Sequence, residues 1–337
     1  MTSSRKWERI RAVLQGESVD RVPMSFWGHD YLREWSAEGL AQAMLAFHQK
    51  YDWDFMKVNP RASYFAEAWG GKFKPSGDPY SQPERVDYAV KSPRDWERVE
   101  RQRPTEGVWA EQLQALTLIN QGLAGSAPFI QTVFSPLSVA GYMASHEMIK
   151  ELMVGDPKIL HGALAAIMET LVGYASACLE RGASGIFFAT TAWATRDLIT
   201  ESQYLEFGRR YDLPVLAAVQ EAPFNILHVC RDNNMLFLLA DYPVTVVNWA
   251  ATLPGNPSLK ECLVSGNKPV MGGVSEKTTL AEGGPESVAA EVYAALEATG
   301  GRRFLLAPGC SISPKTPEAN LMAAREACLR WPEASSI

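Results

Sequence analysis

Short apolar runs alternate along the chain with longer segments in which apolar residues recur at helical spacing. The short runs have the length of buried strands, and the longer amphipathic segments have the length of helices. Eight of the short runs predict strands, at residues 22–26, 55–58, 129–133, 185–188, 225–229, 244–248, 270–272 and 304–306. The clearest amphipathic segments predict helices at residues 38–51, 157–181, 202–219, 285–298 and 317–329.

Buried strands that alternate with helices are typical of a parallel sheet, and eight such strands close into a barrel. We therefore predict an α/β fold, a single (β/α)8 TIM barrel. An open doubly wound sheet is the alternative, but no Gly-x-Gly-x-x-Gly motif follows the first predicted strand. The strand-poor region 70–121 contains several prolines and predicts an insertion after strand 2, at the catalytic end. The length of 337 residues fits one such domain over residues 1–337.

Composition narrows the possible partners and the compartment. Lys and Arg total 32 against 38 Asp and Glu, and no basic block is present, which argues against nucleic acid or an anionic membrane as a partner. Residues 112–145 lack charge, but Gln, Asn and Pro interrupt them too often for a membrane span. Five cysteines are too few for a disulfide scaffold, so we expect reduced thiols and a cytoplasmic protein.

Candidate functional residues follow from the barrel prediction, because the active sites of such barrels lie at the carboxyl ends of the strands. Polar and aromatic side chains stand just past the predicted strand ends: His29, Asp30, Asn59, Arg61, Ser135, Thr190, Thr191, His228, Cys230, Asn248, Trp249, Ser275, Glu276 and Cys310.

Three of these residues suggest a metal site. His228 and Cys230 are two positions apart at the end of the fifth predicted strand, so both can point to the same side, and Cys310 follows the eighth strand across the barrel mouth. Taken singly, His228 and Cys230 are more simply explained as packed core residues. Together with Cys310 they favour Zn²⁺, which prefers nitrogen and sulfur ligands, and three protein ligands leave one position open for catalysis.

The remaining candidates each have a catalytic and a structural interpretation. His29 and Asp30 are a candidate general acid–base pair, or simply polar loop residues. Arg61 is a candidate for holding a substrate carboxylate or sulfonate, or for pairing with Glu67.

A second group of candidates concerns substrate binding and the metal itself. Asn248 either hydrogen-bonds substrate or orients a zinc ligand. Tyr64 and Trp249 either line an aromatic pocket or pack in the core, and Asn59 is a candidate substrate-binding residue. Glu276 is a candidate fourth metal ligand and a candidate substrate contact.

Several segments resemble the uroporphyrinogen decarboxylase superfamily over nearly the whole chain. They are the N-terminal residues 6–10 and 16–23, the Phe-Ser-Pro-Leu-Ser-Val-Ala-Gly-Tyr stretch at 134–142, and the Ala-Pro-Gly-Cys stretch that opens residues 307–320. The chain resembles most the zinc methyltransferase branch, the methylcobamide:coenzyme M methyltransferases. Their His-x-Cys and distant Cys pattern is matched by His228, Cys230 and Cys310, although that branch usually has Gly where Arg231 stands here.

The resemblance implies a zinc-dependent methyltransferase that moves a methyl group between a corrinoid protein and a small thiol, or that demethylates a methoxylated substrate. The chain has no Asp-x-His-x-x-Gly motif, so a corrinoid (cobalamin) is expected on a separate partner protein. The resemblance to the decarboxylase branch implies a homodimer. No predicted helix of this chain shows an exposed apolar face, so the sequence leaves both a monomer and a homodimer open.

Two alternatives remain. The first is a decarboxylase-type lyase acting on a carboxylated substrate. Against it, residues 25–33 lack the arginine pair of that branch, with only Arg33 nearby, and residues 57–64 contain no catalytic acid. The second is a non-catalytic barrel in which zinc is a structural clip.

Overall fold

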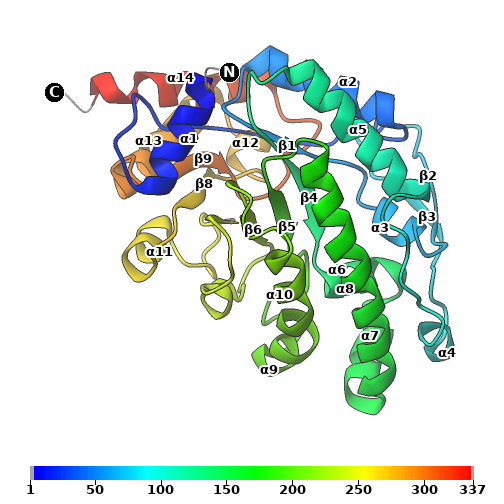
Figure 1. Ribbon diagram of the computed structural model, residues 1–337. Coiled ribbons are helices and arrows are strands. Elements are labelled where there is room, and N and C mark those ends of the chain that lie inside the picture. Colours follow the sequence, from blue (N-terminus) through cyan, green and yellow to red (C-terminus); the bar gives the residue numbers. More distant parts are fainter. Residues whose placement is uncertain (1–3, 335–337) are drawn as a thin grey trace.

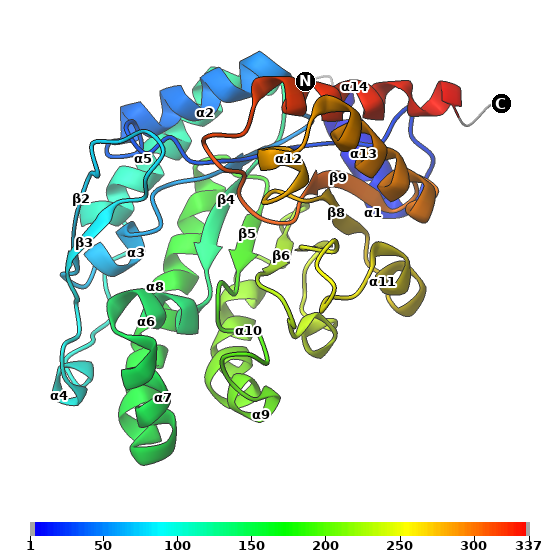
Figure 2. The ribbon, with the colours of Figure 1, turned by 180° about the vertical axis from the view of Figure 1, so that it is seen from behind.

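The computed structural model describes residues 4–334, in which seven parallel strands form one curved sheet. In their order across the sheet, the strands are β1 (Met56–Val58), β4 (Phe129–Phe134), β5 (Ile186–Ala189), β6 (Ile226–Val229), β7 (Val246–Trp249), β8 (Val270–Val274) and β9 (Phe304–Pro308). Every residue of these seven strands is buried. Helices cover the outer face of the sheet (Figures 1 and 2). This arrangement confirms the prediction of a parallel α/β fold.

The first predicted strand, at residues 22–26, is present only as an extended segment. Met24 forms an isolated parallel bridge with Leu306 of β9, and the Leu306 N–H donates to the carbonyl of Pro23. On the other side, the N–H of Asp54, just before β1, donates to the carbonyl of Met24. Pro23 has no N–H to extend the ladder. The segment therefore lies between β9 and the start of β1, at the two edges of the sheet.

The outer layer consists of helices whose ends the sequence marks clearly. The longer ones are α1 (Arg5–Gln15), α2 (Ala37–Tyr51), α5 (Gly107–Leu123), α6 (Pro136–Met143), α7 (His146–Gly155), α8 (Pro157–Glu180), α10 (Arg210–Ala217), α11 (Leu259–Ser265), α13 (Pro285–Thr299) and α14 (Glu318–Ala334). Serine hydroxyls accept a hydrogen bond at the start of α1 and α2, and proline occupies the first turn of α6, α8 and α13. In the outer layer α2 packs on α5, α8 on α10, and α13 on α14.

The predicted helix at 202–219 is divided into three pieces. A short α9 (Glu201–Tyr204) continues into a π-helical turn, η1 (Leu205–Arg209), and then into α10. Pro214 lies inside α10, where it cannot donate a hydrogen bond to the preceding turn. Two further short helices, η2 (Leu236–Leu239) and α12 (Thr279–Glu282), follow β6 and β8.

The region between β1 and β4 departs from the strand–helix alternation. It contains α3 (Tyr64–Glu67), the antiparallel pair β2 (Lys72–Lys74) and β3 (Glu84–Asp87), and α4 (Pro93–Trp96). The sequence did not predict this small sheet, because its strands are short and largely exposed. The last part of the predicted insertion is α5, an ordinary outer helix.

One described helix, α8, is long and apolar enough to cross a membrane by length and composition alone. Half of its most apolar window is buried inside the fold, as in the core helix of a globular domain.

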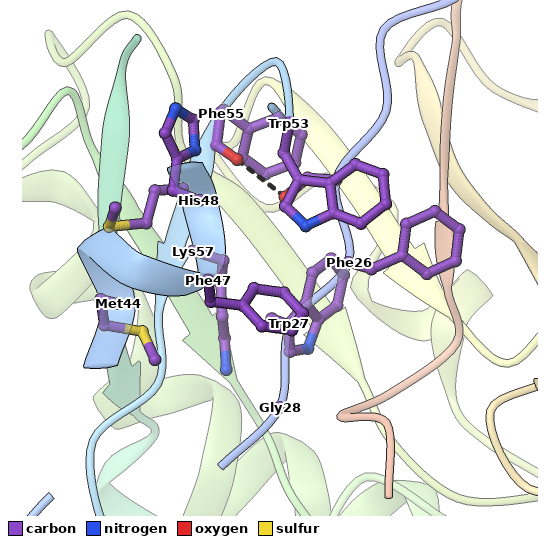
Figure 3. Close-up of a pocket in the computed structure, with 11 residues that line it drawn as sticks. Phe26, Trp27, Gly28, Met44, Phe47, His48, Trp53, Phe55 and Lys57 are labelled. Carbon is purple, nitrogen blue, oxygen red and sulfur yellow. Dashed lines mark hydrogen bonds between the residues drawn. The ribbon is translucent and has the colours of Figure 1, made fainter. Parts of the chain in front are cut away.

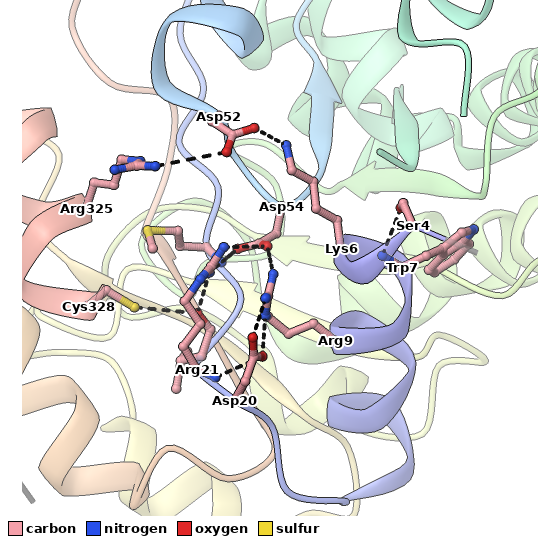
Figure 4. Close-up of polar contacts among 12 residues, drawn as sticks. Ser4, Lys6, Trp7, Arg9, Asp20, Arg21, Asp52, Asp54, Arg325 and Cys328 are labelled. Atoms are coloured by element: carbon pink, nitrogen blue, oxygen red, sulfur yellow. Dashed lines mark hydrogen bonds and ion pairs between the residues drawn. The ribbon is translucent and has the colours of Figure 1, made fainter. Parts of the chain in front are cut away.

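A buried ion network holds the amino-terminal end of the curved sheet (Figure 4). Asp54 is fully buried, and its carboxylate pairs with Arg9 of α1 at 2.6 Å and with Arg21 at 2.6 Å. Arg9 also pairs with Asp20 at 2.6 Å, and the backbone N–H of Met24 donates to Asp54 at 2.8 Å. The network therefore fastens α1 and the segment at 22–26 to the start of β1.

Candidate metal centre

The three predicted metal ligands meet at the carboxyl end of the sheet. His228 lies near the end of β6, Cys230 directly follows β6, and Cys310 follows β9. One ligand atom from each residue lies within 4.8 Å of the other two. The backbone also supports this position, because the N–H and hydroxyl of Thr190 both donate to the carbonyl of His228, at 3.1 and 3.2 Å.

The spacing of the two sulfurs fits a metal better than a disulfide. The Cys230 and Cys310 Sγ atoms are 3.8 Å apart, and both thiols are free. A disulfide needs about 2.05 Å between its sulfurs. A tetrahedron with metal–sulfur bonds of about 2.3 Å, as for zinc, has an edge of about 3.8 Å. One imidazole and two thiolates at this spacing fit a tetrahedral zinc ion.

Asn248 determines which imidazole nitrogen is free. Its Nδ2 donates to the carbonyls of Met271 and Pro308 at 3.0 and 3.2 Å, and carbonyls can only accept. The Asn248 Oδ1 must therefore accept from His228 Nδ1, 2.6 Å away. The Nδ1 of His228 carries the proton and Nε2 is left as the ligand atom, as in metal sites where a second hydrogen bond orients the histidine.

The hydrogen bond between the two thiols shifts their pKa values in opposite directions. A hydrogen bond from Cys230 lowers the pKa of the Cys310 thiol well below its usual value, and the same bond raises the pKa of Cys230. Burial opposes the first shift and adds to the second. The lowered pKa favours the thiolate form of Cys310, which is the form that binds metal.

Phe187 of β5 provides an apolar wall beside the metal ligands. Its ring stacks on the His228 imidazole, with centroids 5.1 Å apart and planes inclined by 25°. Trp27 meets the Phe187 ring edge-on at 5.4 Å.

Tyr64 and Trp249 are packed in the core. Tyr64 lies in α3 among the rings of Phe65, Trp109 and Tyr174, and its hydroxyl is 3.4 Å from that of Tyr174. Trp249 is fully buried, and its indole N–H donates to the carbonyl of Pro257 at 2.7 Å. These contacts match the packing interpretation of both residues.

His29 and Asp30 are not paired with each other. The His29 Nδ1 is 2.8 Å from an oxygen of Glu34, and the His29 ring stacks on Tyr31. Asp30 pairs with Arg33 at 2.6 Å. Glu34 is fully buried, and its second oxygen has no hydrogen-bond partner among the described residues. Sequence reasoning did not find Glu34, because it lies in a loop well past the predicted strand end.

The Arg61 guanidinium is already neutralised. It is buried and pairs with Glu67 at 2.9 Å and with Glu111 at 2.5 Å, and it also donates to the carbonyl of Glu34 at 2.9 Å. Arg61 thus pairs with Glu67, as one of the two interpretations of the sequence predicted, and also with Glu111, which the sequence did not reveal as a partner.

Glu276 and Asn59 are both buried near Cys310. Burial and the nearby Cys310 thiolate raise the pKa of Glu276. The Asn59 Oδ1 accepts a hydrogen bond from Lys57 and lies 3.4 Å from the hydroxyl of Ser311. Sequence reasoning missed Lys57, although a lysine inside an apolar strand, two positions before Asn59, was a usable indication.

Known proteins with similar sequences or structures point to one family. The protein-family model described as "Uroporphyrinogen decarboxylase (URO-D)" matches residues 5–331 of this chain. The methylcobamide:CoM methyltransferase MtbA of Methanosarcina acetivorans is 25% identical over 95% of this chain and 96% of its own. A uroporphyrinogen decarboxylase of Actinobacillus pleuropneumoniae is 30% identical over 29% of each chain. A solved methyltransferase from Methanosarcina mazei has the same fold, with a TM-score of 0.81, 22% identity and coverage of 98% of this chain and 99% of its own.

Proposed function

The chain belongs to the uroporphyrinogen decarboxylase (URO-D) family, and from this premise we propose that it is a zinc-dependent methyltransferase. It moves a methyl group between a separate corrinoid protein and a small thiol or methoxylated substrate. The observation that carries the proposal is the set of His228, Cys230 and Cys310, with its two sulfurs 3.8 Å apart and its imidazole oriented by a buried amide.

Each residue of the site has a defined task in this function. His228 Nε2 and the sulfurs of Cys230 and Cys310 would hold the metal, and Asn248 retains the proton on His228 Nδ1. The chemistry that zinc supplies at such a site is Lewis acidity, which lowers the pKa of a coordinated thiol or improves a methoxy oxygen as a leaving group. Phe187 and Trp27 keep the space beside the imidazole apolar.

Methyl transfer to a thiol balances without a further reactant. The carbon–cobalt bond of the methylated corrinoid breaks and leaves its electron pair on cobalt. A sulfur–carbon bond forms, and the thiol proton passes to solvent. MtbA, a methylcobamide:CoM methyltransferase, supports this reaction class because the two chains match over nearly their whole lengths. The absence of a corrinoid-binding motif in the sequence supports a separate corrinoid protein.

The two alternatives fit the site less well. Porphyrinogen decarboxylation needs several free cationic side chains, but Arg61 is paired with two carboxylates and Arg33 with Asp30. A structural zinc clip requires a fourth protein ligand, whereas the metal cluster within residues 4–334 comprises three.

Metal analysis of the purified full-length protein tests the proposal. We expect about one equivalent of zinc per chain and its loss in Cys310→Ala. Cys262→Ala is the matched control, because Cys262 is a buried cysteine of α11 outside the metal cluster, and it should retain the metal.

The same variants are then compared in methyl transfer. Methylcobalamin is the donor, a set of small thiols are the acceptors, and the loss of methylcobalamin absorbance is the readout. Cys310→Ala should abolish turnover, and Cys262→Ala should leave it intact. Less than about a tenth of an equivalent of zinc in the wild-type protein, or normal turnover in Cys310→Ala, contradicts the proposal.

A further inference from the structure

Two of the five cysteines of this chain face each other at the carboxyl end of the sheet. Cys230 follows β6 and Cys310 follows β9, and their Sγ atoms are 3.8 Å apart. Both side chains are partly exposed, so a small solute can reach the sulfurs. The remaining three cysteines are buried in three different helices, as Cys178 of α8, Cys262 of α11 and Cys328 of α14. Cys230 and Cys310 are therefore the accessible pair of thiols.

The surroundings of Cys310 are those of a reactive cysteine. Reactive cysteines are partly exposed and lie beside positively charged groups, whereas buried structural cysteines are inert. The side chain of Lys57 extends beside the Trp27 ring (Figure 3). Burial lowers the pKa of Lys57 to about 7, and a charged Cys310 sulfur opposes this shift, so the amine lies close to that sulfur. In contrast, burial raises the pKa of Cys262 and of Cys328 to about 12.

A short movement of the two sulfurs is enough to join them. A disulfide needs about 2.05 Å between its sulfurs, so each sulfur must move by about 0.9 Å from the present spacing of 3.8 Å. Rotation of a cysteine about its Cα–Cβ bond moves the sulfur in this way. The backbone can also adjust, because the ladder of the sheet ends before both residues, at Val229 of β6 and Pro308 of β9.

We propose that Cys230 and Cys310 are a site of reversible oxidation, at which hydrogen peroxide converts the two thiols into an intramolecular disulfide. The first thiol attacks the peroxide, the oxygen–oxygen bond breaks, and a sulfenic acid and a water molecule form. The second thiol attacks the sulfenic sulfur, the sulfur–sulfur bond forms, and a second water molecule leaves. The two sulfurs lose two electrons in total, and the peroxide takes them up.

The disulfide would remove two of the three residues that the metal needs. This consequence rests on the proposed function, whereas the oxidation itself does not. Thiolates are the form in which cysteines bind metal, so after oxidation His228 alone remains of the cluster and zinc leaves. Methyl transfer would then stop until a dithiol reductant restores the two thiols. Such a response suits the proposed reaction, because the cobalt that retains the electron pair is itself readily oxidised and needs reducing conditions.

Oxidation of the metal-free, folded protein tests the site directly. The full-length chain is kept in a chelator, treated with an equimolar amount of hydrogen peroxide, and then denatured for thiol counting. We expect two of the five thiols to disappear, the intact mass to fall by two hydrogen atoms, and peptide mapping to link Cys230 to Cys310. Retention of all five thiols, a mixture of pairings, or irreversible addition of oxygen to these cysteines overturns the proposal.

Single variants identify the partners. Cys230→Ala and Cys310→Ala each leave one thiol at the site, so neither should form an intramolecular disulfide. Cys262→Ala is the matched control and should form the same link as the wild type, because Cys262 is buried in α11. Circular dichroism before oxidation shows that each variant is folded. A disulfide in Cys310→Ala would mean that Cys230 pairs elsewhere, and it contradicts the proposal.

Comparison with the zinc-loaded protein separates this inference from the proposed function. Bound zinc should slow the oxidation by at least about tenfold, because coordinated sulfurs are weaker nucleophiles. Each disulfide formed should release one zinc ion to a chromogenic chelator, and dithiothreitol should restore zinc binding. If the metal-free protein forms the disulfide but neither binds zinc nor transfers methyl groups, the oxidation site stands and the proposed function is wrong. If zinc binding and methyl transfer succeed but both thiols survive peroxide, the oxidation site is wrong.

Discussion

Replacing Asn248 by Leu should weaken zinc binding without removing any metal ligand. Leu fills a similar volume but cannot accept the hydrogen from His228 Nδ1, which is now 2.6 Å from the amide oxygen. The imidazole then loses the contact that sets its tautomer and rotation. Loss of such a partner typically reduces metal affinity by about 10- to 100-fold, which corresponds to about 1.4 to 2.8 kcal/mol.

The same substitution also affects folding, and the two effects need separate measurements. In Asn248→Leu the buried carbonyls of Met271 and Pro308 lose their donor, at a cost of about 1 to 3 kcal/mol for each unsatisfied group. Asn225→Leu is a matched control. Asn225 is 1% exposed, accepts from the Ile186 N–H at 3.0 Å and donates to the Val219 carbonyl at 2.7 Å, at the opposite end of β6.

Zinc dissociation constants come from competition with a chromogenic chelator, at a temperature where circular dichroism shows both variants folded. Denaturant titration gives the change in stability. We expect both variants to lose stability, but only Asn248→Leu to lose zinc affinity. The reasoning is refuted if Asn248→Leu binds zinc within about twofold of the wild type, or if Asn225→Leu weakens zinc binding as much.

Two further predictions concern stability away from the metal. Asp54→Asn should lower the free energy of unfolding by about 3 to 5 kcal/mol in denaturant titrations, because it leaves Arg9 and Arg21 without their buried carboxylate. The zinc content should stay unchanged. An unchanged denaturation midpoint argues against this prediction. Burial raises the pKa of Asp212 to about 7 from an ordinary 3.8, even though two tyrosine hydroxyls donate to its carboxylate. The folded state therefore retains a proton on Asp212 that the unfolded chain loses as the pH rises from about 4 to 7. Wild-type stability relative to Asp212→Asn should therefore fall across that window, by at most about 1.4 kcal/mol per pH unit, and level off above pH 7; an equal difference at pH 5 and pH 7.5 contradicts this.

The parallel fold and the meeting of His228, Cys230 and Cys310 were predictable because they follow from local rules. A buried parallel strand appears as a continuous apolar run, and the alternation of side chains along a strand places His228 and Cys230 on one side. The same alternation, applied one residue further, puts Trp249 on the opposite side of β7 from Asn248. For this reason, a position at the end of a strand did not make Trp249 a pocket residue.

Other features depend on contacts between segments far apart in the chain. Glu111, which neutralises Arg61, is 50 positions away from it. Lys57 was missed because its charge suggests exposure, whereas Trp27 and Phe187 enclose it. The first strand was reduced to a bridge because Pro23 limits its ladder, and short exposed strands such as β2 have no apolar pattern from which to predict them.

The amide of Asn248 joins four neighbouring strands at one point. It lies on β7, accepts from His228 on β6, and donates to carbonyls of β8 and β9, the strand that Cys310 follows. A slip of β6 or β9 by one residue would move Cys310 away from His228 and Cys230, and a slip of β7 would take the Asn248 amide away from His228. The site therefore exists only after this half of the sheet has reached its native register. If the protein binds zinc as proposed, zinc loading is then a late event that reports correct assembly, unlike small zinc domains in which the metal drives folding.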